Sequence, residues 1–332
     1  MPKKISLSPH TSDFNSFVAN FTDAVAAGGN VTSDAYWNFW RLRNSDIVVL
    51  HWPDQFFKSG SPLLPLKLLL KMKICQLLFN VKFVWVAHNI VPHGFDQPNY
   101  WAKIFVKNLD GIIHLSRIGY DSIRATYRIS RCTQHCITVH GAYTAQKRPE
   151  MPKNYKKSEG LSVVNFGLIK RYKNLETLIE SFNNLSTTTD KLTISGYSED
   201  ASYLAELKTK INNTRIRLDP KSTIISDSAL ENLVDQADVI ILPYRHILNS
   251  GSTFFALSRW KPVAAPREGA LPELQEIVGS EWLYLYDGDI SSQKLADIIA
   301  WRRTQNLSTP PDMSYYDWTK ISEEINRFFD VL

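Results

Sequence analysis

Residues 244–274 combine groups that suit the binding of a phosphate. The apolar run ADVIILP, which ends just before them, predicts a buried parallel strand. Small residues with helix-capping chemistry follow, and the apolar run FFALSRW predicts a short helix that ends before Pro262. A strand, a Ser/Gly turn and a helix start present free backbone N–H groups and the positive end of the helix dipole to an anion. The alternative is a capped helix that binds no ligand. The candidate residues here are Tyr244, Ser250, Gly251, Ser252 and Thr253.

A second turn offers cations to the same kind of ligand. The run LSVVNFG predicts a strand that ends at Gly167, and Arg171 and Lys173 follow at the start of a helix predicted over 173–185. Cations at a helix N-terminus oppose the macrodipole, so we expect an anionic ligand there. A solvated first helical turn is the alternative interpretation.

Two glutamates lie in the stretch REGALPEL, after a predicted strand with the sequence PVAAP. Glu268 or Glu273 can accept a hydrogen bond from a ribose or sugar hydroxyl. For Glu273 the alternative is structural, because an acidic side chain favours the helix start that Pro272 predicts. We include Glu273 among the candidate binding residues.

Histidines recur where predicted strands end in the first half of the chain, at His51, His88, His114 and His140. A lone histidine is usually structural, but this clustering favours a role in proton transfer. Ligands of parallel α/β sheets bind beyond the carboxyl ends of the strands. We expect His88 and His93 to be the leading pair, with Asp13 in the first loop as the alternative base. The full set of candidates is His10, Asp13, His51, Asp54, His88, His93 and His140.

Metal and redox cofactors are not expected. No Asp-X-Asp motif follows a strand at the phosphate-binding turns, and Asp287-Gly288-Asp289 is interpreted as a turn. Cys132 and Cys136 have no second cysteine pair to complete a zinc site, so free thiols in a reducing cytoplasm are predicted. No GxGxxG motif follows a strand, which argues against a dinucleotide-dependent dehydrogenase.

Strands and helices alternate along the whole chain, which predicts an α/β protein with parallel sheets. The polar, proline-containing stretch 144–160 interrupts the alternation and indicates a linker. We therefore predict a first domain over 1–150, a second over 151–312 and a terminal segment over 313–332, with the ligand in a cleft between the two domains.

Charge is distributed unevenly over the 332 residues, whose formal net charge is +5. Residues 1–150 hold 17 Lys and Arg against 9 Asp and Glu, whereas the remaining residues hold 21 against 24. The basic first half predicts an anionic partner, and no nucleic-acid motif is present. No apolar run is long enough to cross a bilayer and no signal peptide is evident, so we expect a cytoplasmic protein.

Four places in the chain resemble the GT-B glycosyltransferases. The sequence NFGLIKRYKNL at 165–175 is similar to the turn that opens their donor domain, where a Gly precedes a cation that holds the nucleotide diphosphate. Residues 194–196 resemble a strand whose final Gly, here Gly196, faces the nucleotide. Residues 244–263 resemble the donor motif, and the final helix resembles a tail that packs back on the first domain.

The resemblance implies two Rossmann-like domains and transfer of a sugar from a GDP- or UDP-sugar to a saccharide or lipid-linked saccharide. Two glutamates of the common retaining enzymes are replaced here by Ile247 and Phe255, and SGSTFFALSRWKPV is more similar to bacterial exopolysaccharide transferases, including mannosyltransferases. A nucleotide-sugar 2-epimerase and a non-catalytic sugar-nucleotide binder are the alternatives. The nucleotide sugar is a co-substrate, and no cofactor is implied.

The helix predicted over 62–79 is dense in leucine and contains Lys67, Lys71 and Lys73. It suits either a core helix with snorkelling lysines or an interfacial helix on an anionic membrane. The basic first half favours the second interpretation. Three lysines at a headgroup surface would contribute about 3 kcal/mol and give peripheral, salt-sensitive binding at the inner face of the plasma membrane.

Overall fold

The computed structural model describes residues 2–11, 15–35, 37–57, 62–91, 97–143, 150–151, 160–186 and 189–332, without the side chains of 54 and 55. The chain divides into two compact units, one of residues 1–141 with 316–332 and the other of residues 142–315. The divisions predicted from the sequence are 150/151 and 312/313. Most of the predicted linker lies outside the described residues.

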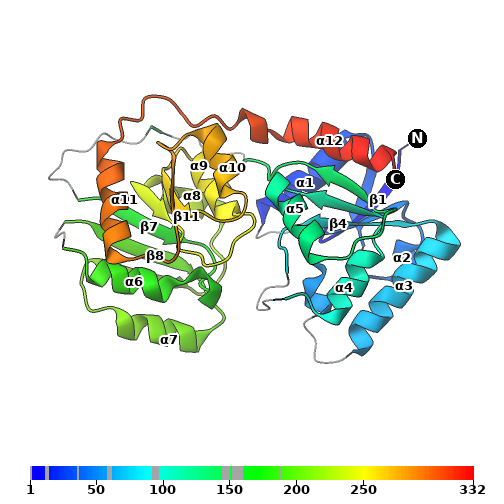
Figure 1. The fold of residues 1–332 in the computed structure, drawn as a ribbon, viewed down its shortest axis with the longest axis horizontal. Coiled ribbons are helices and arrows are strands. Elements are labelled where there is room, and N and C mark those ends of the chain that lie inside the picture. The colour runs from blue at the N-terminus through cyan, green and yellow to red at the C-terminus, as the bar shows by residue number, and fades with distance from the viewer. Residues whose placement is uncertain are drawn as a thin grey trace. The chain divides into compact units, whose positions relative to one another are not determined.

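The first unit contains a six-stranded parallel sheet in the order β2-β1-β3-β4-β5-β6 (Figure 1). Short apolar runs such as IVVL in β3 and KFVWVA in β4 are buried, as expected for strands covered by helices on both faces. Its strands are β1 Lys4–Ser8, β2 Val31–Asp34, β3 Ile47–Leu50, β4 Lys82–Ala87, β5 Gly111–His114 and β6 Gln134–Ile137.

Helices cover both faces of this sheet. Leu68 and Met72 of α3 and Phe105 of α4 pack with Phe83 and Trp85 of β4 in one core, and α1 packs against α12. The helices of this unit are α1 Ser16–Ala27, α2 Phe39–Leu42, α3 Leu63–Phe79, α4 Tyr100–Lys107, α5 Arg117–Thr126 and α12 Trp318–Asp330. Residues Pro53–Phe56 form a 3-10 turn.

The second unit repeats the plan with the strand order β12-β11-β10-β7-β8-β9, again all parallel. Strand β7 lies between β8 and β10, so the strand order reverses direction at the boundary of β7 and β10. Its strands are β7 Ser162–Phe166, β8 Lys191–Tyr197, β9 Ile216–Lys221, β10 Val239–Ile241, β11 Val263–Pro266 and β12 Leu283–Tyr286.

The core of the second unit is formed by β-sheet residues together with Leu178 of α6, Tyr203 of α7 and Ile298 of α11. The helices are α6 Leu175–Asn183, α7 Ala201–Lys210, α8 Asp227–Asp235, α9 Gly251–Ser258, α10 Leu271–Val278 and α11 Ser292–Thr304. Residues Arg171–Lys173 and Ser314–Tyr316 form 3-10 turns. The predicted fold class, α/β with two Rossmann-like units, is confirmed.

Helix α12 belongs to the first unit although it is the last element of the chain (Figure 1). Asp317 caps its N-terminus by accepting a hydrogen bond from the Thr319 amide. The Asn326 side chain donates to the Ala24 carbonyl of α1 at 2.9 Å. These contacts hold the end of the chain against α1.

Three local features differ from the sequence analysis. Strand β2 and helix α2 were not predicted, because each is only four residues long and half exposed or polar. The helix expected from Lys173 begins at Leu175, since the 3-10 turn over Arg171–Lys173 is followed by Asn174 in a left-handed conformation with φ of 55°. Within the described residues, no helix has both the length and the apolar character to cross a bilayer.

Candidate functional site

The two predicted phosphate-binding turns of the second unit lie side by side. Gly167 directly follows β7, and Tyr244 and α9 follow β10, which pairs with β7 through Val164 and Ile240. In open parallel sheets, ligands bind outside the carboxyl ends of the strands where the strand order reverses. The sheet topology therefore brings both turns to the position where a ligand is expected.

The Lys173 ammonium, Gly167 and Ser252 meet at this edge of the sheet. Gly167 has a φ of +98°, and a Cβ atom added to it would lie 3.0 Å from Lys173 Nζ and 3.9 Å from Ser252 Oγ. A side chain here would therefore occupy the space beside the ammonium. Glycine leaves that space open and also permits the left-handed backbone that the turn requires.

Lys173 is a buried cation, only 5% exposed. Its Nζ atom lies 3.4 Å from the Phe166 carbonyl oxygen and 5.1 Å from the centroid of the Tyr244 ring. Among the described residues, no carboxylate forms an ion pair with it. Burial lowers the pKa of the Lys173 ammonium, which means that its charge is poorly solvated in the ligand-free protein. An anion bound at this position would offset that cost.

Tyr244 forms one wall of the cluster. Its hydroxyl lies 3.4 Å from Ser252 Oγ, and its ring packs at 6.2 Å from the ring of Tyr172. Burial raises the pKa of the Tyr244 hydroxyl to about 12, so the hydroxyl stays protonated and can donate a hydrogen bond.

The N-terminus of α9 provides the neutral donors. Ser250 caps the helix, because its Oγ accepts a hydrogen bond from the Thr253 amide at 3.1 Å. Gly251 and Ser252 form the first turn, in which backbone N–H groups lack intrahelical partners. Thr253 is fully buried, and its Oγ1 has no hydrogen-bond partner among the described residues. A capped helix start beside a buried cation that forms no ion pair with the described residues fits a phosphate group.

In the first unit, three of the strand-end histidines lie together around Phe17 of α1. The Phe17 ring is 6.1 Å from His51, 5.1 Å from His88 and 4.5 Å from His140, between ring centroids. His51 Nδ1 and His88 Nε2 are 3.1 Å apart and share one hydrogen bond. The side chain of Trp52 stacks on His88 with centroids 4.5 Å apart.

These histidines are neutral near pH 7. Burial lowers the pKa of His51 to about 3 and that of His140 to about 4. The pKa of His88 is also well below its usual value, first because of burial and then because of His51 and His140. In the His51–His88 pair one neutral ring therefore donates the hydrogen bond and the other accepts it.

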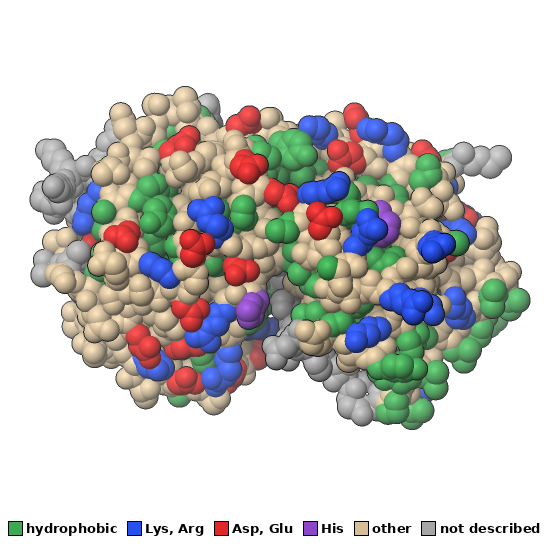
Figure 2. All heavy atoms as spheres, viewed as in Figure 1, with side chains coloured by type: hydrophobic (Ala, Val, Ile, Leu, Met, Phe, Trp, Pro, Cys, Tyr) green, Lys and Arg blue, Asp and Glu red, His purple; other side chains and the backbone are tan. Residues whose placement is uncertain are grey.

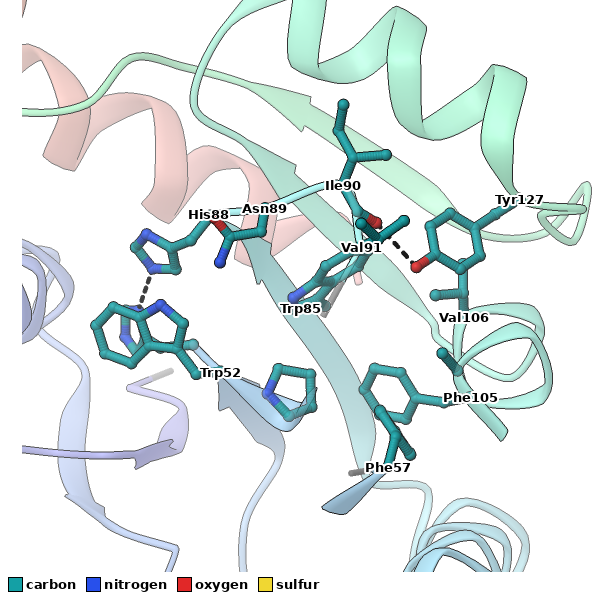
Figure 3. A pocket seen from close by; sticks show the side chains of 13 residues that line it. Trp52, Phe57, Trp85, His88, Asn89, Ile90, Val91, Phe105, Val106 and Tyr127 are labelled. Carbon is teal, nitrogen blue, oxygen red and sulfur yellow. Dashed lines mark hydrogen bonds between the residues drawn. The ribbon is translucent and has the colours of Figure 1, made fainter. Parts of the chain in front are cut away.

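An aromatic pocket adjoins the histidine pair (Figure 3). The Tyr127 hydroxyl donates a hydrogen bond to the Ile90 carbonyl at 2.9 Å. The polar groups in this part of the wall therefore bond to each other. The pocket is bounded by the ends of β3 and β4, by α4 and by the end of α5. It is lined by His51, Trp52, Pro53, Phe57, Trp85, His88, Asn89, Ile90, Val91, Ala102, Phe105, Val106 and Tyr127.

No protein-family model matches the sequence. The chain is 25% identical over 292 residues to the GDP-mannose:glycolipid 4-beta-D-mannosyltransferase of Xanthomonas campestris, which covers 85% of this chain and 78% of that enzyme. The crystal structure of Anabaena HepE in complex with UDP-glucose matches with a TM-score of 0.71 at 13% identity and covers both chains fully. The chain is a GT-B glycosyltransferase.

Another solved structure has the same fold as this glycosyltransferase. Sucrose-phosphate synthase from Thermosynechococcus elongatus matches with a TM-score of 0.68 at 15% identity, covering 100% of this chain and 99% of that one. The predicted resemblance and the predicted enzyme class are thus confirmed. The epimerase and the non-catalytic binder are not favoured.

Arg171 of the glycosyltransferase does not join the cluster around Lys173. Its guanidinium pairs with Glu206 at 2.8 Å and Asp200 at 3.4 Å, and it lies 4.6 Å from the centroid of the Tyr203 ring. The carboxylates of α7 and its N-cap thus neutralise Arg171. The expectation that Arg171 and Lys173 act alike has no support in these contacts.

Gly196 and Glu273 have structural explanations. A Cβ atom on Gly196 would lie 1.6 Å from the Gly167 carbonyl oxygen, so Gly196 allows the Gly167 turn to approach β8. Glu273 lies in the first turn of α10, where an acidic side chain is favourable. Direct contact of either residue with the donor stays a prediction.

Several predicted acceptor-side residues are not part of the described cluster. Asp13 and His93 lie outside the described residues, so their roles stay predictions. His114 does not join the other strand-end histidines, since its Nε2 lies 3.0 Å from His135 Nδ1 instead. In the described part of the glycosyltransferase, no group of three or more His, Cys, Asp or Glu side chains is placed to hold a metal ion.

The aromatic pocket was not foreseen from the sequence. Trp52 follows His51 directly, so a histidine and a tryptophan at one strand end were a usable signal. The other walls come from Trp85, Phe105 and Tyr127, which are far apart in the chain. Only the strand order, which makes β3 and β4 neighbours, brings them together.

Proposed function

We propose that this glycosyltransferase moves a mannosyl group from GDP-mannose to a lipid-linked saccharide during the synthesis of a bacterial surface polysaccharide. The supporting observation is the buried Lys173 ammonium, which has no carboxylate partner within the described residues and lies beside the N-terminus of α9. The mannosyltransferase of Xanthomonas supports the choice of GDP-mannose and of a glycolipid acceptor, because it aligns over 85% of the chain. UDP-sugars are the second class of donor to test.

The donor diphosphate is proposed to bind at the edge of the second sheet. Lys173 supplies the positive charge, while Ser252, the Tyr244 hydroxyl and the amides of the first turn of α9 supply hydrogen bonds. When the glycosidic bond to the diphosphate breaks, the leaving group gains negative charge. A preorganised cation and helix start stabilise that charge without a metal ion.

The acceptor hydroxyl is proposed to react at the histidine pair of the first unit. Its oxygen attacks the anomeric carbon, the bond from that carbon to the diphosphate breaks, and the hydroxyl proton passes to a base. His88 is the proposed base because it is a histidine that lines the aromatic pocket. His51 is the proposed positioning residue, because it shares a hydrogen bond with His88. Asp13 stays the alternative base.

The place of the reaction follows from its substrates. A nucleotide sugar is made in the cytoplasm, and a lipid-linked acceptor is held in a membrane. We therefore propose that the protein works as a peripheral enzyme at the inner face of the plasma membrane. The basic balance of residues 1–150 supports an approach to anionic lipids.

A transfer assay tests the proposed function. The protein is incubated with radiolabelled GDP-mannose, or with labelled UDP-glucose, and a lipid extract from a polysaccharide-producing bacterium. We expect label from GDP-mannose in the organic phase, in a product whose mass exceeds that of the acceptor by one hexose, and loss of that label when His88 is replaced by Ala. A nucleotide sugar of altered configuration, formed without any acceptor, would instead identify an epimerase.

A further inference from the structure

Helix α3 has two apolar faces, and among the described residues only one of them is covered. Leu68, Leu69, Met72 and Cys75 point into the core of the first unit, and Pro65 is also buried. On the opposite side, a row of leucines spaced by three, four and seven residues faces outward at positions 63, 66, 70 and 77. A surface helix ordinarily presents polar side chains on that side. The outward side of α3 is therefore unusual for a protein surface.

The exposure of this side is large. Leu77 is 80% exposed, Leu78 is 72% and Leu63 is 60%. Figure 2 shows hydrophobic side chains gathered at the lower right, where Figure 1 places α3, with Lys and Arg among them. Elsewhere in the described chain, large exposed apolar side chains are mostly single and scattered, which is normal. A contiguous patch of this kind marks an interaction surface.

An aromatic and basic group continues the patch at the C-terminal end of α3. Trp40 of α2 is 61% exposed. The Arg43 guanidinium lies 4.2 Å from the centroid of the Trp40 ring and 5.7 Å from that of Phe79. Tryptophan and arginine on one apolar surface suit the boundary between lipid headgroups and acyl chains.

The charges on α3 all have one sign. The helix contains Lys67, Lys71 and Lys73 and no acidic residue. Lys67 and Lys73 are exposed among the leucines, whereas Lys71 is half-buried and its ammonium donates to the Trp37 carbonyl at 3.0 Å. Lysine is depleted from the cores of protein–protein interfaces, but it fits an interfacial helix whose leucines enter the membrane while its ammonium groups stay at the headgroups.

We propose that the outward side of α3, with Trp40 and Arg43, inserts into the headgroup region of an anionic bilayer. We call it the α3 face. This proposal rests on the proposed function, from which it takes the lipid-linked acceptor. It adds the exposed side chains that contact the bilayer and the way in which they bind. Because leucines enter the bilayer, attachment persists at high salt. This differs from the expectation that three lysines produce salt-sensitive binding, since Lys71 is engaged elsewhere and the leucines are the exposed groups.

Vesicle flotation tests the α3 face, with vesicles of phosphatidylcholine alone or mixed with phosphatidylglycerol, at low salt and at about 1 M salt, where the Debye length is about 3 Å. We expect the wild type to float with the mixed vesicles at both salt concentrations. The double variant Leu70→Ser/Leu77→Ser should lose at least about tenfold in vesicle binding, because each leucine loses its burial in the bilayer. The matched control Val31→Ser/Val331→Ser changes exposed apolar residues outside the α3 face and should float as the wild type does.

The lysines are tested separately. The variant Lys67→Gln/Lys73→Gln should lose the preference for phosphatidylglycerol at low salt but keep its binding at high salt. Nucleotide-induced thermal stabilisation should be equal in all variants. Loss of vesicle binding by the α3 face can therefore be distinguished from loss of the proposed nucleotide-sugar binding. A wild type that ignores both kinds of vesicle would overturn the proposal. So would a wild-type dimer that becomes monomeric in the leucine variant, because the face would then join two copies of the chain.

Discussion

At the scale of single residues, Lys173 carries the largest expected effect on donor binding. We predict that Lys173→Ala weakens binding of GDP-mannose by about 1.5–3 kcal/mol, or roughly 10- to 150-fold, because a hydrogen bond to a charged group is lost. Isothermal titration measures this affinity. The matched control is Arg171→Ala, which removes a neighbouring cation that already pairs with Glu206 and Asp200 and should change the affinity little.

Stability separates a binding role of Lys173 from a structural one. We predict that Lys173→Met leaves the thermal midpoint of the ligand-free protein unchanged or higher, because a poorly solvated buried charge is replaced by an apolar side chain of similar length. The same variant should lose the stabilisation that nucleotide provides to the wild type. A large fall in the midpoint without nucleotide would mean that Lys173 mainly supports the fold.

The buried histidines predict a dependence of stability on pH. The pKa of His51 is lowered to about 3 in the folded protein, against roughly 6.5 in an unfolded chain. Between these values the unfolded chain binds a proton that the folded protein does not, so stability falls as the pH drops below about 6.5. His140, with a pKa of about 4, acts in the same direction. We predict a thermal midpoint that decreases steadily from about pH 7 to pH 5, whereas a flat profile would contradict the burial of these rings.

At the scale of elements, the close approach of β8 to the Gly167 turn shapes the proposed donor site. We predict that Gly196→Ala lowers both the thermal midpoint and the nucleotide affinity, because its Cβ would displace the Gly167 carbonyl, 1.6 Å away. Gly29→Ala is the control. Gly29 also has a positive φ, of +81°, but a Cβ there meets nothing within 4 Å. Its strain of about 1–2 kcal/mol should leave nucleotide binding unchanged, and equal effects on binding would contradict this account.

Elements of the second unit could be predicted from local signals. Apolar runs and the Ser/Gly turn located β10 and α9 correctly, because capping by Ser250 is a property of neighbouring residues. Partners distant in the chain could not be predicted. Arg171 forms an ion pair with Glu206, and His114 forms a hydrogen bond with His135. Both contacts depend on where the fold places helices and strands that are distant in the chain. Leucine density alone could not separate a core α3 from an interfacial one, because it indicates burial equally well; the charge balance favoured the interfacial helix, and the structure supplies its exposed leucines.

At the scale of the whole molecule, the reaction is expected to need no metal ion. Lys173 and the N-terminus of α9 are proposed to neutralise the leaving diphosphate in place of a cation. We predict that transfer from GDP-mannose continues in excess EDTA at close to the untreated rate. Complete loss of transfer in EDTA, restored by manganese, would show that a metal carries this charge.

Titration of the whole protein with GDP-mannose is the most direct test of the central claim, that the turn after β7 and the start of α9 hold a nucleotide sugar. We predict saturable binding at one site by the wild type, an affinity reduced by about 10- to 150-fold in Lys173→Ala, and an unchanged affinity in Arg171→Ala. If the folded wild type bound neither GDP-mannose nor a UDP-sugar, or if Lys173→Ala bound GDP-mannose as tightly as the wild type, the donor site would have to be placed elsewhere.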